Sequence, residues 1–210
     1  MNVPSRTAAR VAYAAAAVNL VAAAVMGLWL RHGIFLGDLS ARMWVARHFA
    51  LWRLGWLLWH AAAILLLTLF VVLSLRWRDR APVLARVSLL VAAAGLAADL
   101  AAETFFIAFQ PRTISANLFV VSGSYSVVLT GYLGNGLYTA AGIMLTWAGR
   151  RDLPRMLLWL SVPVWGAGLW LSAATLAGSE WGQVSSTAIL MPMFVLWAFL
   201  LGRWLQTNAS

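Results

Sequence analysis

The chain has 210 residues, of which 63% are hydrophobic and only 10% are charged. A soluble globular domain averages about 45–50% hydrophobic and about 25% charged residues, so this excess of apolar side chains predicts a surface that faces lipid. The absence of cysteine excludes disulfides and iron–sulfur clusters held by this chain. The net charge of +9 does not indicate nucleic acid as a partner, because the arginines are spread between apolar runs instead of forming one patch.

Six apolar runs follow one another along the chain, and each is close to the length of about 20 residues that a membrane-spanning helix needs. We expect an all-α, polytopic membrane helix bundle in which residues 1–210 form one six-helix transmembrane domain, with the lipid bilayer as its first partner. The predicted spans cover residues 7–30, 54–75, 83–109, 124–148, 156–176 and 186–205.

Two of the predicted connections are longer than a tight turn. In residues 33–54, Arg42, Arg47 and Arg53 alternate with large apolar side chains. This pattern predicts a short helix that lies in the membrane interface, or else the exposed first turns of the second span. The other connection, residues 111–123, begins with a proline, which removes a backbone donor and is expected to end the third span.

The arginines also predict the orientation of the bundle. Six spans place both termini on one side of the membrane, and ten of the fifteen arginines fall in the segments on that side. Cytoplasmic segments of membrane proteins carry the excess of basic residues. We therefore expect both termini to be cytoplasmic, in a multi-pass protein of the cytoplasmic (inner) membrane.

The third predicted span contains the two acidic residues that lie inside an apolar run, Asp99 and Glu103. They are four residues apart, so they share one face of a helix. A charged side chain at the centre of a membrane costs about 2.5–3.5 kcal/mol on insertion scales, and such residues usually mark functional sites. The sequence therefore predicts that this helix face points into the bundle and carries a site.

Helical rise places further polar residues at the same depth. With the termini inside, the second span enters from outside near Arg53, and His60 lies about 10 Å deeper. Glu103 lies about 10 Å below the same boundary, and Tyr132 and Asn135 of the fourth span fall at a similar level. The predicted ligand-binding residues are therefore His60, Asp99, Glu103, Tyr132, Asn135 and Arg53.

Three functions are compatible with this cluster. In the one we favour, the cluster opens to the outside and binds or moves a small ligand, ion or proton. In the second, the protein is an intramembrane enzyme, metal-dependent or acid–base, with His60, Asp99 and Glu103 as its catalytic candidates. In the third, it is an accessory subunit of a larger membrane complex or a homo-oligomer. Ion pairs of Arg53 with Glu103 and of His60 with Asp99 then only fix helix packing.

The same three side chains are the candidate metal ligands. One imidazole and two carboxylates suit a divalent metal, although the spacing of His60, Asp99 and Glu103 matches no standard metal motif. A haem is not expected, because His60 is the only histidine inside a predicted span. The sequence does not indicate which ligand or substrate is bound.

The run from Gly123 to Ser172 has a Ser/Gly/Tyr-rich entry to the fourth span, then Leu153-Pro154-Arg155, then a glycine-containing fifth span. In these features it resembles a widespread family of small bacterial six-span membrane proteins described only as a domain of unknown function. The chain departs from that pattern in its fourth predicted span, which has Asn135 and lacks the histidines that the resemblance leads us to expect there. The resemblance implies the six-span architecture and a bacterial inner membrane, and it implies no activity and no site.

Overall fold

The computed structural model describes residues 4–34, 38–112 and 116–208, and within these ranges it contains helices and no strand. The all-α fold expected from the sequence is confirmed. Several long helices continue through short π-helical or 3-10 segments, which are labelled η. The elements in chain order are α1 (Ser5–Val25), η1 (Met26–Leu30), α2 (Arg31–Ile34), α3 (Asp38–Arg47), α4 (Phe49–Trp77), α5 (Pro82–Thr104), η2 (Phe105–Phe109), η3 (Gln110–Arg112), α6 (Ala116–Val127), η4 (Val128–Gly134), α7 (Asn135–Ala148), α8 (Arg155–Leu176) and α9 (Glu180–Thr207).

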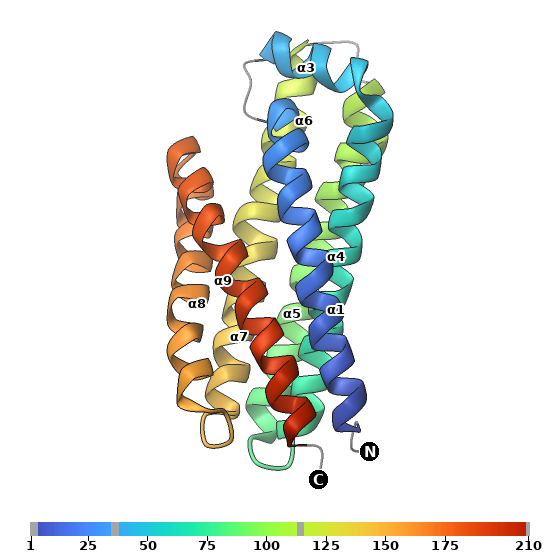
Figure 1. Cartoon of the computed structure of the whole chain (residues 1–210). Helices are drawn as coiled ribbons and strands as arrows, with labels where there is room; N and C mark the ends of the chain where they lie inside the picture. Colours follow the sequence, from blue (N-terminus) through green and yellow to red (C-terminus); the bar gives the residue numbers. More distant parts are fainter. Residues whose placement is uncertain (1–3, 35–37, 113–115, 209–210) are drawn as a thin grey trace.

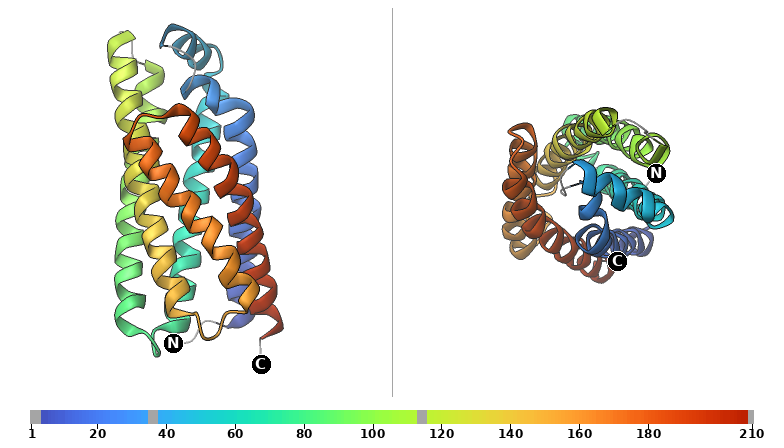
Figure 2. Two further views of the ribbon diagram at one scale, coloured as in Figure 1. Left: turned by 90° about the vertical axis from the view of Figure 1, so that its left-hand side faces the viewer. Right: turned by 90° about the horizontal axis from the view of Figure 1, so that it is seen from above.

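The long helices run up and down, and both ends of the chain lie at the same end of the bundle (Figure 1). We call this the terminal end, and the opposite end, where α3 lies across the bundle, the α3 end. Each long helix packs against the next one along the chain, and α9 returns to pack against α1. The helices therefore close into a ring when they are viewed along the bundle (Figure 2).

Within the described residues, five helical stretches are long and apolar enough to cross a membrane. They are Ser5–Ile34, Phe49–Trp77, Pro82–Arg112, Arg155–Leu176 and Glu180–Thr207. The remaining long stretch, formed by α6, η4 and α7, is of similar length but contains many Ser, Gly, Thr and Tyr residues. Large apolar side chains such as Leu90 and Trp159 are 71% and 76% exposed on the outside of the bundle. These lengths and this surface are compatible with a multi-pass membrane protein.

The two predicted connections are largely helical. Residues 38–47 form the separate short helix α3, and the chain from Phe49 onward forms the first turns of α4, so residues 33–54 contain both a short helix and the start of the next long one. The place of α3 in a membrane interface stays a prediction. The prediction of a connection over residues 111–123 is wrong from Ala116 onward, because the apolar residues there begin α6. Residues 35–37 and 113–115 of these connections lie outside the described residues.

The half of the bundle nearer the terminal end has a continuous aromatic core. Trp77, Trp165 and Trp197 are at most 8% exposed and belong to one hydrophobic cluster. Their polar atoms help to fix the packing, since the Trp197 indole donates to Ser161 Oγ over 3.0 Å. Small side chains on α1, among them Ala12, complete this core and let α9 approach closely.

A second hydrophobic cluster lies at the α3 end. Its centre is Trp56, whose ring stacks on Phe106 with ring centroids 4.1 Å apart. The Trp52 indole nitrogen donates a hydrogen bond of 2.7 Å to the Phe106 carbonyl oxygen. Phe106 lies in the π-helical segment η2, where the normal helical hydrogen-bond pattern is interrupted. A side chain of α4 thus holds an irregular turn of the neighbouring helix.

Candidate functional site

The polar face of α5 is buried as the sequence predicts. Ser88, Gly95, Asp99 and Glu103 all belong to the buried face of this helix. A Cβ atom added at Gly95 would lie 3.1 Å from the Gly134 carbonyl oxygen. The absence of a side chain at this position lets η4 and α7 approach closely and brings them alongside the two acids.

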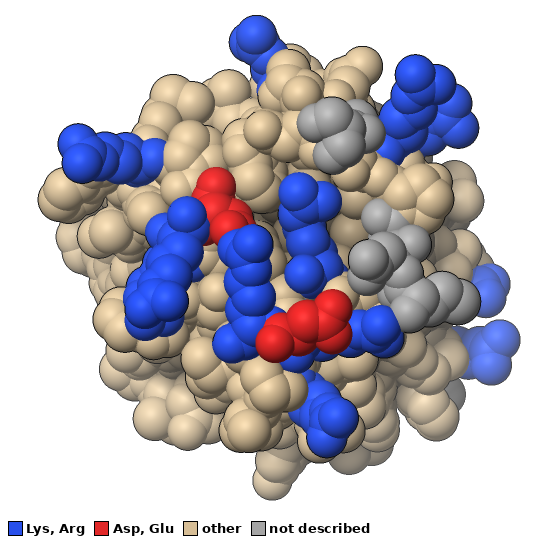
Figure 3. Space-filling model, turned by 90° about the horizontal axis from the view of Figure 1, so that it is seen from below, with Lys and Arg blue, Asp and Glu red and all other residues tan. Residues whose placement is uncertain are grey.

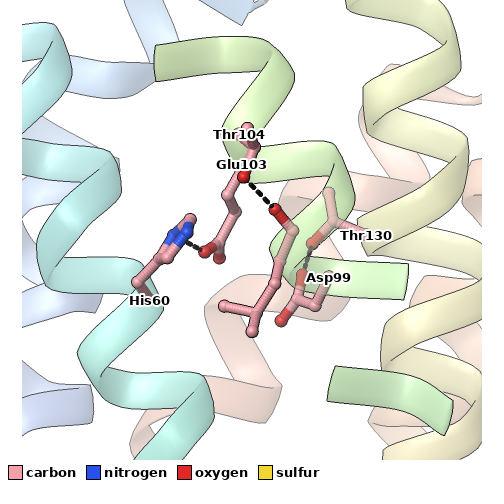
Figure 4. Close-up of polar contacts among 6 residues, drawn as sticks. His60, Asp99, Glu103, Thr104 and Thr130 are labelled. Atoms are coloured by element: carbon pink, nitrogen blue, oxygen red, sulfur yellow. Dashed lines mark hydrogen bonds and ion pairs between the residues drawn. The ribbon is translucent and has the colours of Figure 1, made fainter. Parts of the chain in front are cut away.

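His60 and Glu103 form an ion pair across the α4–α5 interface, between His60 Nδ1 and Glu103 Oε2 (Figure 4). The Glu103 side chain is 0% exposed and that of His60 is 22% exposed. The other carboxylate oxygen, Glu103 Oε1, is buried and has no hydrogen-bond partner among the described residues. A buried charge without compensation is costly, so this contact with His60 largely determines whether the carboxylate is tolerated here.

Asp99 is held from the other side of the site. Thr130 of η4 donates its hydroxyl hydrogen to Asp99 Oδ1 (Figure 4), and the Asp99 side chain is 5% exposed. Asp99 also lies within electrostatic range of His60 and of the Tyr138 hydroxyl. The Tyr138 hydroxyl is buried and makes no hydrogen bond of normal geometry within the described ranges. The site therefore joins side chains from α4, α5, η4 and α7.

Arg53 and Tyr132 lie apart from this cluster. Arg53 is exposed, and its guanidinium group lies 5.2 Å from the centroid of the Phe49 ring. The expected pairing of Arg53 with Glu103 and of His60 with Asp99 is wrong, because Glu103 pairs with His60. Tyr132 is 39% exposed on the outside of η4.

Asn135 has a different set of contacts from the one expected. Its amide nitrogen donates to the Gly168 carbonyl oxygen over 2.7 Å and to Ser172 Oγ over 2.9 Å. Both acceptors belong to α8, the helix that follows α7 in the chain. The contacts of Asn135 are therefore those of a residue that joins two helices.

The contribution of Thr130 was missed by the sequence analysis. Thr130, Gly134 and Tyr138 are spaced by four residues and lie on the side of η4 and α7 that meets α5. Asn135 lies on a neighbouring face that meets α8. Two polar faces this close together on one helix can be distinguished only when it is known which helices pack against them. The four-residue spacing from Thr130 to Tyr138 was the available signal.

The three candidate metal ligands do not converge. Among the described residues, no group of three or more His, Asp or Glu side chains has an arrangement suited to a metal ion. Glu103 points toward His60, whereas Asp99 points toward Thr130 (Figure 4). The geometry suits the holding and exchange of protons better than the coordination of a metal by all three groups.

A partly open cavity of about 280 Å³ lies near the site at the α3 end. It is lined by residues of α2, α3, η2, η3, α6, η4, α8 and α9, including Phe106, Gln110, Ser124 and Gln183. Gln110 is 3% exposed, and its Oε1 has no hydrogen-bond partner among the described residues. Phe106 follows Glu103 by three residues, so the cavity comes within about one helical turn, or about 5 Å along the axis, of the ion pair.

No family model, no curated protein and no solved structure matches this chain. The resemblance of the Gly123–Ser172 run to small bacterial six-span proteins therefore stays a prediction. The site is interpreted from its own geometry.

Proposed function

We propose that this chain is a six-span inner-membrane protein with cytoplasmic termini that binds or moves a proton, ion or small ligand through a polar cluster open to the outside. The cluster consists of His60, Asp99 and Glu103. The stretch from α6 to α7 forms a span in addition to the five long apolar stretches, and it is the fourth of the six in chain order, between α5 and α8. Support for this orientation comes from the arginine distribution, which concentrates basic residues at the terminal end.

One observation carries the proposal, namely that the Glu103 carboxylate is fully buried against His60 while one of its oxygens has no hydrogen-bond partner among the described residues. A pair that served packing alone would be more stable with every polar atom satisfied. The unpartnered Oε1 is an acceptor available to a proton, a cation or the hydrogen-bond donor of a ligand. The cavity at the α3 end supplies an approach from the side that the topology assigns to the outside.

The arrangement supports proton exchange between neighbours. His60 Nδ1 and Glu103 Oε2 are in direct contact, so a proton between them can be bound by either atom. Asp99 lies within electrostatic range of His60, so three titratable side chains lie close together at this level of the bundle. Phe106 lines the cavity and stacks on Trp56, and movement of its ring would control access to the pair.

The enzyme alternative has less support from the same geometry. A metal-dependent enzyme needs ligands that converge, whereas Asp99 and Glu103 point to different partners. An acid–base enzyme needs space for a substrate next to its catalytic groups. The cavity is lined by Phe106 and Gln110, and neither acid lines it.

Proton movement into sealed liposomes tests the proposed function. Purified protein is reconstituted with a pH-sensitive dye inside, and an acid pulse is applied with a potassium gradient and valinomycin to balance charge. The wild-type protein is expected to acidify the lumen faster than empty liposomes, and Glu103→Gln is expected to abolish the difference. Asp79→Asn, which changes an exposed carboxylate in the turn after α4, is the matched control and keeps the wild-type rate. Equal rates for the wild type and Glu103→Gln would refute a role of this pair in proton movement.

The orientation is tested separately. Because the chain has no cysteine, single-cysteine variants need no modified background. Thr207→Cys at the terminal end and Leu39→Cys at the α3 end are exposed to a membrane-impermeant maleimide on intact spheroplasts. The proposed orientation predicts labelling of Leu39→Cys alone, and the opposite pattern would contradict it.

A further inference from the structure

A hollow at the terminal end is independent of the buried cluster. It lies between the turn that joins α4 to α5 and the turn that joins α7 to α8, and its charged lining is mainly basic. The residues that line it are Arg80, Ala81, Ala148, Arg150, Arg151 and Asp152. Figure 3 shows this end of the molecule, where arginine side chains surround a few acidic groups.

We propose that this hollow binds the phosphate group of an anionic phospholipid headgroup. Three of its six lining residues are arginines and one is an aspartate, so the lining carries a net charge of +2. The guanidinium group presents five donors in a planar fork that matches phosphate oxygens, and it stays charged at any relevant pH. The small side chains of Ala81 and Ala148 leave room for a headgroup between the arginines.

The hollow is held in shape without its ligand. Arg80 and Asp152 form an ion pair that joins the two turns, yet the Arg80 side chain remains 65% exposed. Gly149 lies against the buried ring of Trp77, where an added Cβ atom would come within 2.7 Å of Trp77 Cη2. A pre-shaped site needs less ordering when the ligand binds, and this favours affinity.

Arg150 is also held in place beside the hollow. Its guanidinium group lies 4.2 Å from the centroid of the Trp147 ring and donates to the Trp147 carbonyl oxygen over 2.9 Å. One of its five donors is used in this bond, so the others remain available to an anion. Trp147 is 59% exposed, as expected for an aromatic residue at the level of lipid headgroups.

The surface next to the hollow favours a lipid over a free phosphate ion. On α5, Val83 and Leu90 are each 71% exposed, and on α7 Ile143 is 40% exposed. These two helices pack against each other, and α5 begins and α7 ends at the turns that line the hollow, so both expose apolar side chains close to it. Acyl chains can lie along this surface while the phosphate stays among the arginines. Basic pockets between transmembrane helices bind anionic headgroups in this way.

Native mass spectrometry of the purified chain in detergent micelles tests the assignment. Dimyristoyl phosphatidylglycerol and dimyristoyl phosphatidylcholine are added at equal concentration, and the bound lipids are counted. Preferential retention of phosphatidylglycerol is expected. Arg150→Gln/Arg151→Gln, which leaves the Arg80–Asp152 pair intact, is expected to weaken that retention about fivefold per arginine, or about twenty-five-fold in all. Equal retention of the two lipids by the wild type would overturn the proposal.

Arg155→Gln/Arg203→Gln is the matched control, because both arginines are exposed and neither lines the hollow. It removes the same charge and is expected to keep lipid retention within about twofold of wild type. An equal loss in the control would show non-specific attraction and overturn the site. Thermal unfolding of both double variants confirms that the fold is kept. Displacement of phosphatidylglycerol by an equal concentration of inorganic phosphate would assign the hollow to a soluble anion and overturn the lipid assignment.

Discussion

Replacement of His60 by leucine removes the one partner that the Glu103 carboxylate has among the described residues. Glu103 is 0% exposed, and its second oxygen already lacks a hydrogen bond among the described residues, so His60→Leu leaves it without compensation. Breaking a buried ion pair from one side costs about 3–5 kcal/mol. Glu103→Leu is expected to be milder, because the imidazole that remains is 22% exposed and can still reach polar surroundings.

The double variant His60→Leu/Glu103→Leu separates coupling from simple loss of polar groups. Replacement of a buried pair by apolar residues of similar volume is often neutral or stabilising. We therefore expect the double variant to be more stable than the sum of the single variants predicts, by at least about 2 kcal/mol.

The free energy of unfolding, measured for the wild type and the three variants in dodecyl maltoside micelles titrated with sodium dodecyl sulfate, gives each value and their coupling. As a control, Asp79→Asn at the exposed Arg78–Asp79 pair is expected to change stability by less than about 0.5 kcal/mol. A destabilisation below about 1 kcal/mol for His60→Leu, or additive effects in the double variant, would refute a buried and coupled pair.

Three further predictions use the same unfolding measurement. Thr130→Val removes the donor to the buried Asp99 carboxylate and is expected to cost about 1.5–3 kcal/mol, whereas Thr130→Ser keeps the hydroxyl and most of the stability; equal losses would contradict the hydrogen bond. Gly95→Ala forces α5 and α7 apart and is expected to cost about 1–3 kcal/mol, whereas Gly27→Ala, whose Cβ atom meets nothing within 4 Å, is expected to be neutral or stabilising. Trp52→Phe keeps an aromatic side chain, with a smaller ring, but loses the 2.7 Å bond to the carbonyl of η2, at an expected cost of about 1–3 kcal/mol, and faster hydrogen exchange in η2 would accompany it.

The level of the buried cluster could be predicted from helical rise, but its pairing could not. His60 and Glu103 lie at matching depth on adjacent helices, as the sequence indicates, and they are in contact. Arg53 was expected to join them because it is nearly two turns from His60 on the same helix. Its long side chain instead reaches toward the exposed end of α4, where it lies over Phe49. Depth follows from the sequence, whereas the direction of a long charged side chain depends on the nearest polar surroundings.

The π-helical segments explain most of the remaining differences. Thr130 reaches Asp99 from the π-helical segment η4, although its four-residue spacing to Gly134 and Tyr138 is that of one helix face. The burial of Trp52 was also outside the prediction, because the indole finds its acceptor in a carbonyl of η2. The spacing of apolar residues predicts where the helices lie. It does not predict where a helix becomes π-helical, with an extra residue in one turn.

The closure of the ring by α9 on α1 has a consequence for how the protein is made. Tyr13 of α1 packs over Gly202 and donates a hydrogen bond of 3.1 Å to Gln206 Oε1, so the first helix has its partner near the end of the chain. At about 5–20 residues per second, α1 waits on the order of ten seconds or longer in the membrane before α9 is synthesised. During that time its small-residue face is open to any other helix in the bilayer. Any early contacts on this face of α1 must therefore be exchanged before α9 can pack against it and close the ring.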